Sequence, residues 1–344
     1  IIGAFLIPLF RAHARSAYML AWPLAAFALL LTLPHGGLAP VTLFGLELEL
    51  LRVDRLSLIF GYIFLIASLL GVMYQLHVRD TVQHVAGLVY AGSAIGAVFA
   101  GDLVTLFLFW EGTAISSVFL IWAARTERSL AAGMRYLLIQ IGSGVLLLAG
   151  ALIHYQQTGS IAFNSFDPES LAGALILLSF AIKCAFPLLH NWLQDAYPEA
   201  TVAGTVMLSA FTTKLAVYAL IRGFAGTEIL VPIGAAMTAF PIFYAVIEND
   251  LRRVLAYSLN NQLGFMVVGV GIGTEMAING AVAHAFCHIL YKALLFMSMG
   301  AVLLRTGTCK GSELGGLYRT MPWSAGFCIV GAASISAFPL FSGF

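Results

Sequence analysis

Residues 181–190 read AIKCAFPLLH and place Lys183 inside an apolar run that extends from Leu171 to Leu189. A run of this kind is close to the ~20 residues that cross a membrane, where a charged amine costs at least ~2.5 kcal/mol. Pro187 follows four residues later, and a proline within a helix removes a backbone hydrogen bond and clashes with the preceding turn. The stretch therefore predicts a membrane helix that breaks beside a buried lysine.

The composition extends this prediction to the whole chain. Hydrophobic residues make up 60% of the 344 residues and charged residues only 10%, which is too little polar surface to cover a soluble globule. The net charge of +1 argues against nucleic acid as a partner. The four cysteines show neither a CxxC pair nor zinc-finger spacing. We expect an all-α polytopic membrane protein that has no cofactor and no bound metal.

Apolar segments recur along the chain with short polar joints between them, so spans rather than soluble domains are the natural unit. Their number predicts about twelve transmembrane helices in a single domain over residues 1–344. The segments fall at 1–10, 17–34, 56–76, 82–100, 102–123, 134–154, 171–192, 201–222, 229–247, 254–273, 277–304 and 322–344.

Basic residues in the joints predict the orientation. Three of them, Arg52, Arg55 and Arg222, fall on one side of the membrane. The other side is cytoplasmic by the positive-inside rule, although its joint at residues 190–200 has neither lysine nor arginine. That side carries Arg11, Arg15, Arg79, Arg125, Arg128, Arg135, Arg252, Arg253, Arg305, Lys310 and Arg319.

A short internal repeat pairs two apolar spans. The tetrapeptide AFPL occurs at residues 185–188 and again at 337–340, so that Pro187 and Pro339 should each break a helix. Broken helices at corresponding places in two halves indicate a transport site near the midplane of the membrane. A match of four residues is also short enough to arise by chance.

Six ionisable side chains lie well inside predicted spans: Glu111, Lys183, Lys214, His284, His288 and Lys292. One interpretation of Glu111 and Lys183 is a structural ion pair. The other is a two-state proton carrier, because burial disfavours the charged amine whereas a carboxylate that moves close favours it. Lys214 follows two threonines that would bridge it toward Lys183, and its alternative is a lysine that extends to the membrane surface.

The spacing of His284, His288 and Lys292 places all three on one helix face, within about 80° and roughly 12 Å. This pattern is typical of a ladder for proton hopping. Two other interpretations remain: the histidines form hydrogen bonds to neighbouring helices, or they bind zinc, for which spacing i, i+4 is common. Zinc is disfavoured because HAFCH lacks the glutamate of HExxH and no other carboxylate lies on the predicted span.

The longest motifs resemble a known family. From about Val53 to Phe344, the chain is similar to the antiporter-like subunits of respiratory complex I and of Mrp-type Na+/H+ antiporters, and most similar to the D branch of the Mrp type. The motifs are AIKCAFPLLHNWLQDAYPEATVAGTVMLSAFTTKLAVYAL, ENDLRRVLAYSLNNQLGFM, AHAFCHILYKALLFMSMGAVL and SISAFPLFSGF.

This resemblance implies two inverted five-helix repeats, each with one proline-broken helix, around a hydrated polar axis. The N-terminal helices would occupy residues 1–80, the first repeat 81–222 and the second 229–344, incomplete at Phe344. By motif position Glu111 matches the family's helix-5 glutamate, Lys183 its broken-helix lysine and Lys214 its helix-8 lysine. The residues of its helix-11 HxxxHxxxK set are His284, His288 and Lys292.

Three departures from the family pattern matter. Arg252 stands where lysine is frequent, and arginine does not release a proton, so we place it outside the path. Gln194 replaces the proline usual in WLPDA. The family's exit group would lie beyond Phe344, and the apolar ends at Ile1 and Phe344 lead us to expect most, not all, of a natural subunit.

The sequence therefore predicts a proton-translocating subunit of a multisubunit Na+/H+ antiporter in the bacterial inner membrane, a secondary transporter rather than an enzyme. Its partners would be other membrane subunits, H+ and Na+, although one buried carboxylate is thin provision for Na+. Three alternatives remain: a proton-pumping subunit of a complex I-like dehydrogenase or membrane-bound hydrogenase, a structural scaffold, and an intramembrane metalloenzyme.

Overall fold

The computed structural model describes residues 1–43 and 45–344, without the side chain of residue 12. Over these residues the elements are η1 (Ile2–Leu9), α1 (Ala12–Leu30), β1 (Gly36–Leu43), β2 (Leu46–Val53), α2 (Arg55–Gln75), α3 (Thr81–Phe99), α4 (Leu103–Trp122), α5 (Glu127–Thr158), α6 (Leu171–Lys183), α7 (Asn191–Ala196), α8 (Val202–Ala210), α9 (Thr212–Phe224), α10 (Leu230–Ile247), α11 (Leu251–Ile272), α12 (Glu275–Thr306), η2 (Gly311–Glu313), α13 (Leu317–Thr320) and α14 (Pro322–Ile335).

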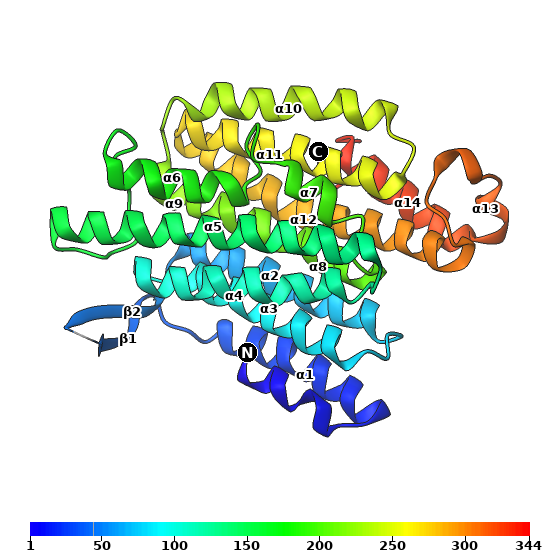
Figure 1. Cartoon of the computed structure of the whole chain (residues 1–344), viewed down its shortest axis with the longest axis horizontal. Helices are drawn as coiled ribbons and strands as arrows, with labels where there is room; N and C mark the ends of the chain where they lie inside the picture. Colours follow the sequence, from blue (N-terminus) through cyan, green and yellow to red (C-terminus); the bar gives the residue numbers. More distant parts are fainter. Residues whose placement is uncertain (44) are drawn as a thin grey trace.

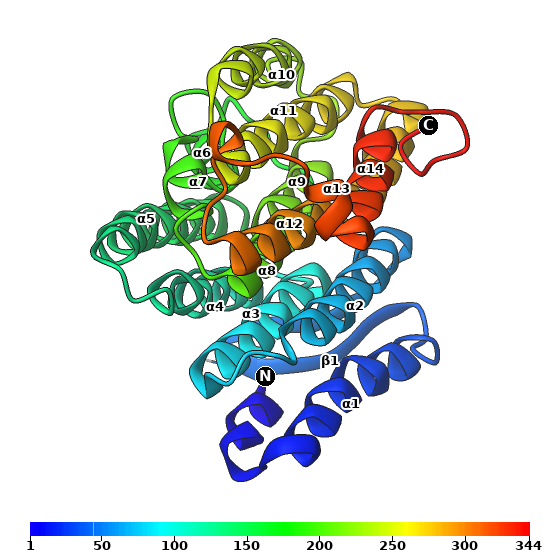
Figure 2. The same cartoon turned by 90° about the vertical axis from the view of Figure 1, so that its right-hand side faces the viewer.

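Most helices run side by side along the longest dimension of the molecule (Figure 1). Seen from one end, they stack from η1 and α1 through α2, α3 and α4 to α10 and α11 (Figure 2). In the described part of the chain, seven helical stretches are long and apolar enough to cross a membrane, with α8 and α9 counted together. The predicted class of a helical membrane protein is confirmed. Each predicted span overlaps a helical element, but α6 and α14 end at Lys183 and Ile335, before the predicted bounds at residues 192 and 344, and the 201–222 span is divided between α8 and α9.

Polar side chains determine where many of the helices begin. A residue before the first turn accepts a hydrogen bond from a free backbone N–H, which stabilises a helix start by about 1 kcal/mol. Asp54 and Thr126 form full capping boxes with Ser57 and Ser129. The other side-chain caps are Asp80, Asp102, Ser170, Thr201, Asp250 and Thr274.

The two AFPL segments adopt the same backbone conformation. In each, the alanine and the leucine have left-handed φ angles: 60° and 69° at Ala185 and Leu188, and 52° and 73° at Ala337 and Leu340. In each, the phenylalanine N–H bonds the carbonyl five residues before it, at 3.1 Å for Phe186 and 3.0 Å for Phe338. This pattern terminates α6 and α14 in the manner of a Schellman motif. The predicted helix breaks at Pro187 and Pro339 are both present.

A β-hairpin, formed by β1 and β2, is an addition that the sequence analysis did not anticipate. Leu43 pairs with Leu46 at its tip and Gly36 with Val53 at its base. The alternation LELEL within β2 is the period-two pattern of a half-buried strand. The Glu49 backbone N–H donates to Asp102 Oδ2 at 2.9 Å, which attaches the hairpin to the start of α4.

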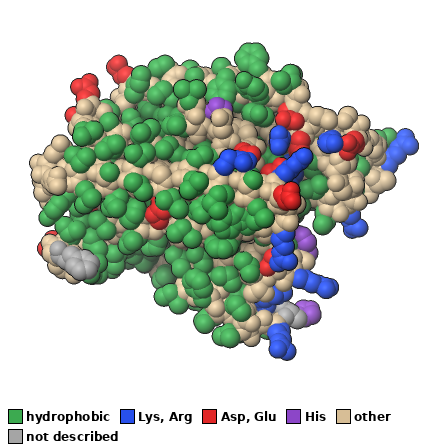
Figure 3. Space-filling view, viewed as in Figure 1, with side chains coloured by type: hydrophobic (Ala, Val, Ile, Leu, Met, Phe, Trp, Pro, Cys, Tyr) green, Lys and Arg blue, Asp and Glu red, His purple; other side chains and the backbone are tan. Residues whose placement is uncertain are grey.

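The two ends of the bundle differ in charge. Lys and Arg side chains gather toward the end opposite the hairpin, and a broad hydrophobic surface separates the two ends (Figure 3). We call them the basic end and the hairpin end. The 190–200 joint, which has no basic residue of its own, lies at the basic end: its Asp195 pairs with Arg135 at 2.7 Å, and its Glu199 pairs with Arg253 at 3.6 Å.

Candidate functional site

Lys183 is the last residue of α6 and is fully buried. Its amine donates to the Trp110 carbonyl at 2.6 Å and to the Thr113 hydroxyl at 2.8 Å, both on α4. The same amine lies 4.4 Å from the centre of the Trp110 ring. These partners are neutral, so they tolerate either protonation state of the amine.

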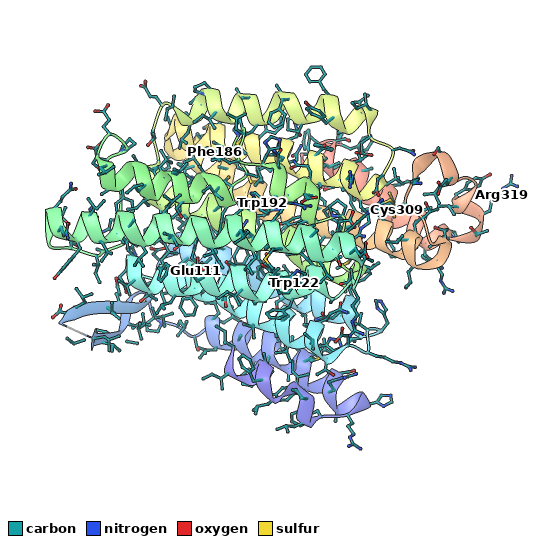
Figure 4. The ribbon with its side chains drawn as sticks, viewed as in Figure 1. Glu111, Trp122, Phe186, Trp192, Cys309 and Arg319 are labelled. Atoms are coloured by element: carbon teal, nitrogen blue, oxygen red, sulfur yellow. The ribbon has the colours of Figure 1, made fainter. Side chains whose placement is uncertain are left out.

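Glu111 follows Trp110 on α4, near the middle of the bundle's length (Figure 4). Its Oε1 atom is buried and has no hydrogen-bond partner among the described residues. The carboxylate lies near enough to Lys183 to interact electrostatically, yet neither side chain takes part in an ion pair within the described residues. It rests against Gly144 of α5, where an added Cβ would overlap it. Over the described residues, Glu111 and Lys183 thus lie close together without the direct ion pair that was one interpretation of the sequence.

Lys214 lies just after a second helix interruption, which the sequence analysis missed. The backbone angles of Phe211, φ −106° and ψ −66°, separate α8 from α9. This frees the Ser209 carbonyl, which accepts from the Lys214 amine at 2.6 Å. Lys214 is fully buried, so the alternative of a lysine that extends to the membrane surface is wrong.

The three predicted residues of α12 divide into two environments. His288 and Lys292 are fully buried, Lys292 donates to the Ser258 hydroxyl at 2.9 Å, and both interact electrostatically with Lys214. His284 also interacts electrostatically with Lys214 but is only partly buried; it contacts Gln262 at 2.9 Å and lines a cavity of about 560 Å³ beside the second AFPL segment. The His284 and His288 ring centres are 6.1 Å apart.

Several buried polar atoms of α5, α9, α11 and α12 have no hydrogen-bond partner among the described residues. Both ring nitrogens of His288, the Thr213 hydroxyl and both amide atoms of Gln140 and Asn260 are of this kind. Unpartnered polar atoms in a membrane interior are costly unless water reaches them. The sequence analysis missed Gln140 and Asn260, although each is a polar residue within an apolar span of α5 or α11.

Two neighbouring cavities lie between the first helix break and the 190–200 joint at the basic end. The first, of about 380 Å³, is lined by Pro187, Leu188, His190 and Tyr257 among others. The second, of about 240 Å³, shares His190 and Tyr257 and continues to Gln194 and Asp195. The amide of Gln194, which occupies the usual proline position, is buried without a partner among the described residues.

Arg252 lies apart from the row of ionisable groups. Its guanidinium donates to the Ala200 carbonyl at 2.8 Å and to the Thr205 hydroxyl, and so ties α11 to the joint between α7 and α8. Within residues 1–43 and 45–344, no three His, Cys, Asp or Glu side chains gather in a way that could hold a metal ion.

The arrangement allows one kind of chemistry. Lys183 of α6, Lys214 of α9 and both His288 and Lys292 of α12 are fully buried, and Glu111 of α4, close to Lys183, is half-buried. We call these five groups the row of ionisable groups. Groups of this kind, spaced so that water can bridge them, can pass a proton from one to the next.

The chain belongs to a family of membrane subunits described as NADH:quinone oxidoreductase/Mrp antiporter, transmembrane, which it matches over residues 100–344. It is 32% identical to the D subunit of the Na(+)/H(+) antiporter of Alkalihalophilus pseudofirmus over 72% of its own length and 54% of that protein. It is 30% identical to hydrogenase-4 component B of Escherichia coli over 90% of its length and 52% of that protein. The chain thus spans about half the length of these curated relatives.

Two solved structures share its fold. The Mrp complex from Dietzia sp. contains a chain with a TM-score of 0.83 and 25% identity, which matches 96% of this chain and 66% of that one. A chain of an archaeal membrane-bound sulfane sulfur reductase gives a TM-score of 0.87 at 23% identity, and the match covers 100% of this chain and 77% of that one. The recognised family and its membrane-helical fold are confirmed.

Proposed function

We propose that the chain is a proton-translocating subunit and that Glu111, Lys183, Lys214, His288 and Lys292 carry the proton along the membrane midplane. His284 would connect this row to the cavity beside the second AFPL segment. The observation that carries the proposal is the buried Lys183 amine: within the described residues its hydrogen bonds go to the neutral Trp110 carbonyl and Thr113 hydroxyl, while Oε1 of the nearby Glu111 has no partner.

The two states of the carrier follow from the movement of one charge. When the Glu111 carboxylate approaches Lys183, the charged amine is favoured; when it withdraws, burial favours release of the proton. Since the neutral partners of Lys183 remain in place in both states, no large rearrangement is required. Protons would arrive from the basic end through the cavities at His190 and Gln194.

We further propose that the subunit works within a multisubunit Na+/H+ antiporter in the bacterial inner membrane. The likeness to the D subunit of such an antiporter and to a chain of the Mrp complex supports this assignment. The repeat division at residues 81–222 and 229–344 belongs to the same proposal, and the matching conformations of the AFPL segments support it. A secondary transporter needs no catalytic residue, so none is assigned.

A redox-driven pump is the second candidate. The likeness to hydrogenase-4 component B and to NADH-quinone oxidoreductase subunits favours it. In that case the same row of residues would move protons, and the energy would come from a partner enzyme. Co-purification with iron–sulfur or flavin subunits selects this alternative.

The test is Na+-driven proton movement, measured by dye quenching in everted vesicles that contain the complete complex. Lys183→Ala is compared with wild type, and assembly is checked in parallel. We expect exchange to be lost while the complex assembles normally. Normal exchange in the variant would exclude Lys183 from the path, whereas a lower yield of the complex with normal exchange per complex would indicate a scaffold.

A further inference from the structure

One face of α9 continues from Lys214 toward the hairpin end. Lys214, Tyr218 and Arg222 follow one another at intervals of four residues, so they lie on the same side of the helix, about 6 Å apart along its axis. Tyr218 is fully buried, and the Arg222 side chain is only 6% exposed. A polar column thus leads away from a buried lysine toward the membrane surface.

Arg222 closes this column with every nitrogen of its guanidinium engaged. Its two terminal nitrogens meet the two carboxylate oxygens of Asp54, at 2.9 and 3.0 Å, and its Nε donates to the Tyr218 hydroxyl at 2.8 Å. The Tyr218 hydroxyl in turn donates to the Val98 carbonyl at the end of α3. Bidentate pairing of this kind holds a guanidinium in one place.

Further contacts hold Asp54 itself. Its carboxylate caps α2 through the Ser57 N–H at 2.8 Å, and Arg52 approaches it from the other side at 3.3 Å. Burial alone would raise the pKa of Asp54, but the hydrogen bonds from Arg222 and Ser57 and the charges of Arg222 and Arg52 lower it to about 2. At neutral pH the carboxylate is therefore ionised and keeps Arg222 anchored.

We propose that Arg222, held by Asp54 and Tyr218, is an electrostatic seal that prevents protons and other cations from passing between Lys214 and the hairpin end. Arg222 and Arg52 share the single carboxylate of Asp54, so the cluster keeps one net positive charge, which repels cations, and arginine does not release its own proton. The proposal rests on the proposed role of Lys214 as a proton carrier. It gives the Arg222–Asp54 pair a function besides joining α2 to α9.

The test measures passive proton entry into vesicles that contain the complete complex, without Na+ and under a K+ diffusion potential, with a pH-sensitive dye inside. Arg222→Met should raise the rate about tenfold over wild type, which corresponds to about 1.4 kcal/mol of barrier. Arg222→Lys keeps the charge and should stay near the wild-type rate, because the ionised Asp54 carboxylate beside it favours the charged amine. Arg55→Met removes an equal charge from an exposed residue at the same end and is the matched control.

Two further variants test the path of the leak. Adding Lys214→Met or Tyr218→Phe to Arg222→Met should return the rate toward wild type, because each removes a step of the column. A wild-type rate in assembled Arg222→Met, or equal leaks in Arg222→Met and Arg222→Lys, overturns the seal and leaves a structural clamp. If the double variant Arg222→Met with Lys214→Met leaks as fast as Arg222→Met alone, the leaking protons do not pass through Lys214, and the proposed column is wrong. Na+-driven exchange in Lys183→Ala is read separately, so failure of the relay is distinguishable from failure of the seal.

Discussion

The two AFPL segments have nearly the same backbone but different chemistry. The first break is preceded by Lys183, whose amine reaches Trp110 and Thr113 of α4. At the matching position before the second break stands Ile335, and there the Ser334 and Ser342 hydroxyls bond each other at 2.6 Å. The proline and the hydrophobic residues around it are therefore sufficient to break the helix, and the charge is an independent feature. This separation is why we assign Lys183 to function and Pro187 to shape.

The largest effect should come from removing this difference. Lys183→Ile gives the first break the side chain of the second and should lower Na+-driven exchange by about tenfold or more, as expected when a proton carrier is lost. Adding Ile335→Lys should not restore exchange, because the Trp110 carbonyl and Thr113 hydroxyl receive an amine only at the first break. Ile335→Ala is the control and should transport normally. Exchange restored by the double variant would show that the position of the lysine is unimportant.

A second effect concerns the carboxylate beside the first break. Gly144→Ala should cost about 1–3 kcal/mol of stability, because the new methyl group overlaps the Glu111 carboxylate. Exchange should fall as well, since the carboxylate must move away from its present position. Gly142→Ala on the same helix meets no atom within 4 Å and should stabilise α5 by about 0.5–1 kcal/mol. Equal melting temperatures for the two variants would contradict the packing of Glu111 described above.

Lowering the pH should reduce the stability of the fold by protonating Asp54. Because its folded pKa, about 2, lies below the usual value near 3.9, its stabilising contribution is complete above that usual value and is lost as the pH falls toward 2. Thermal unfolding of the detergent-solubilised complex should therefore separate wild type from Asp54→Asn at pH 5 and bring the two together near pH 2. A constant difference between them over this range would exclude the titration of Asp54 as its source.

The smallest expected effect is a change in stability when glycine replaces the left-handed alanine, and it should be the same at both breaks. Ala185 and Ala337 have φ angles of 60° and 52°, a region in which a Cβ costs roughly 1–2 kcal/mol and glycine does not. Ala185→Gly and Ala337→Gly should each stabilise the fold by up to about 1 kcal/mol, partly offset by the greater freedom of glycine in the unfolded chain. Similar shifts in melting temperature would support the common geometry, and opposite shifts would contradict it.

The sequence predicted the features that depend on a charge or a proline. Lys183, Pro187 and Pro339 could be identified because each is rare within an apolar run. The interruption at Phe211 has no such sign, because it lies in AFTTK and no proline or glycine marks it. Gln140 and Asn260 were missed because neutral amides do not stand out in a search for charges. That the Glu111 carboxylate lies against Gly144 depends on how closely α4 and α5 approach there, which spacing along the chain cannot reveal.

The alanines at the two breaks also bear on how the protein moves. Because Ala185 and Ala337 each keep a Cβ where glycine would be freer, each break has fewer accessible backbone conformations and is a fixed corner rather than a hinge. Alternating access would then require no bending at Pro187. It would depend on side-chain rotations, such as a swing of Glu111, and on water that forms and loses continuous wires between rigid helices.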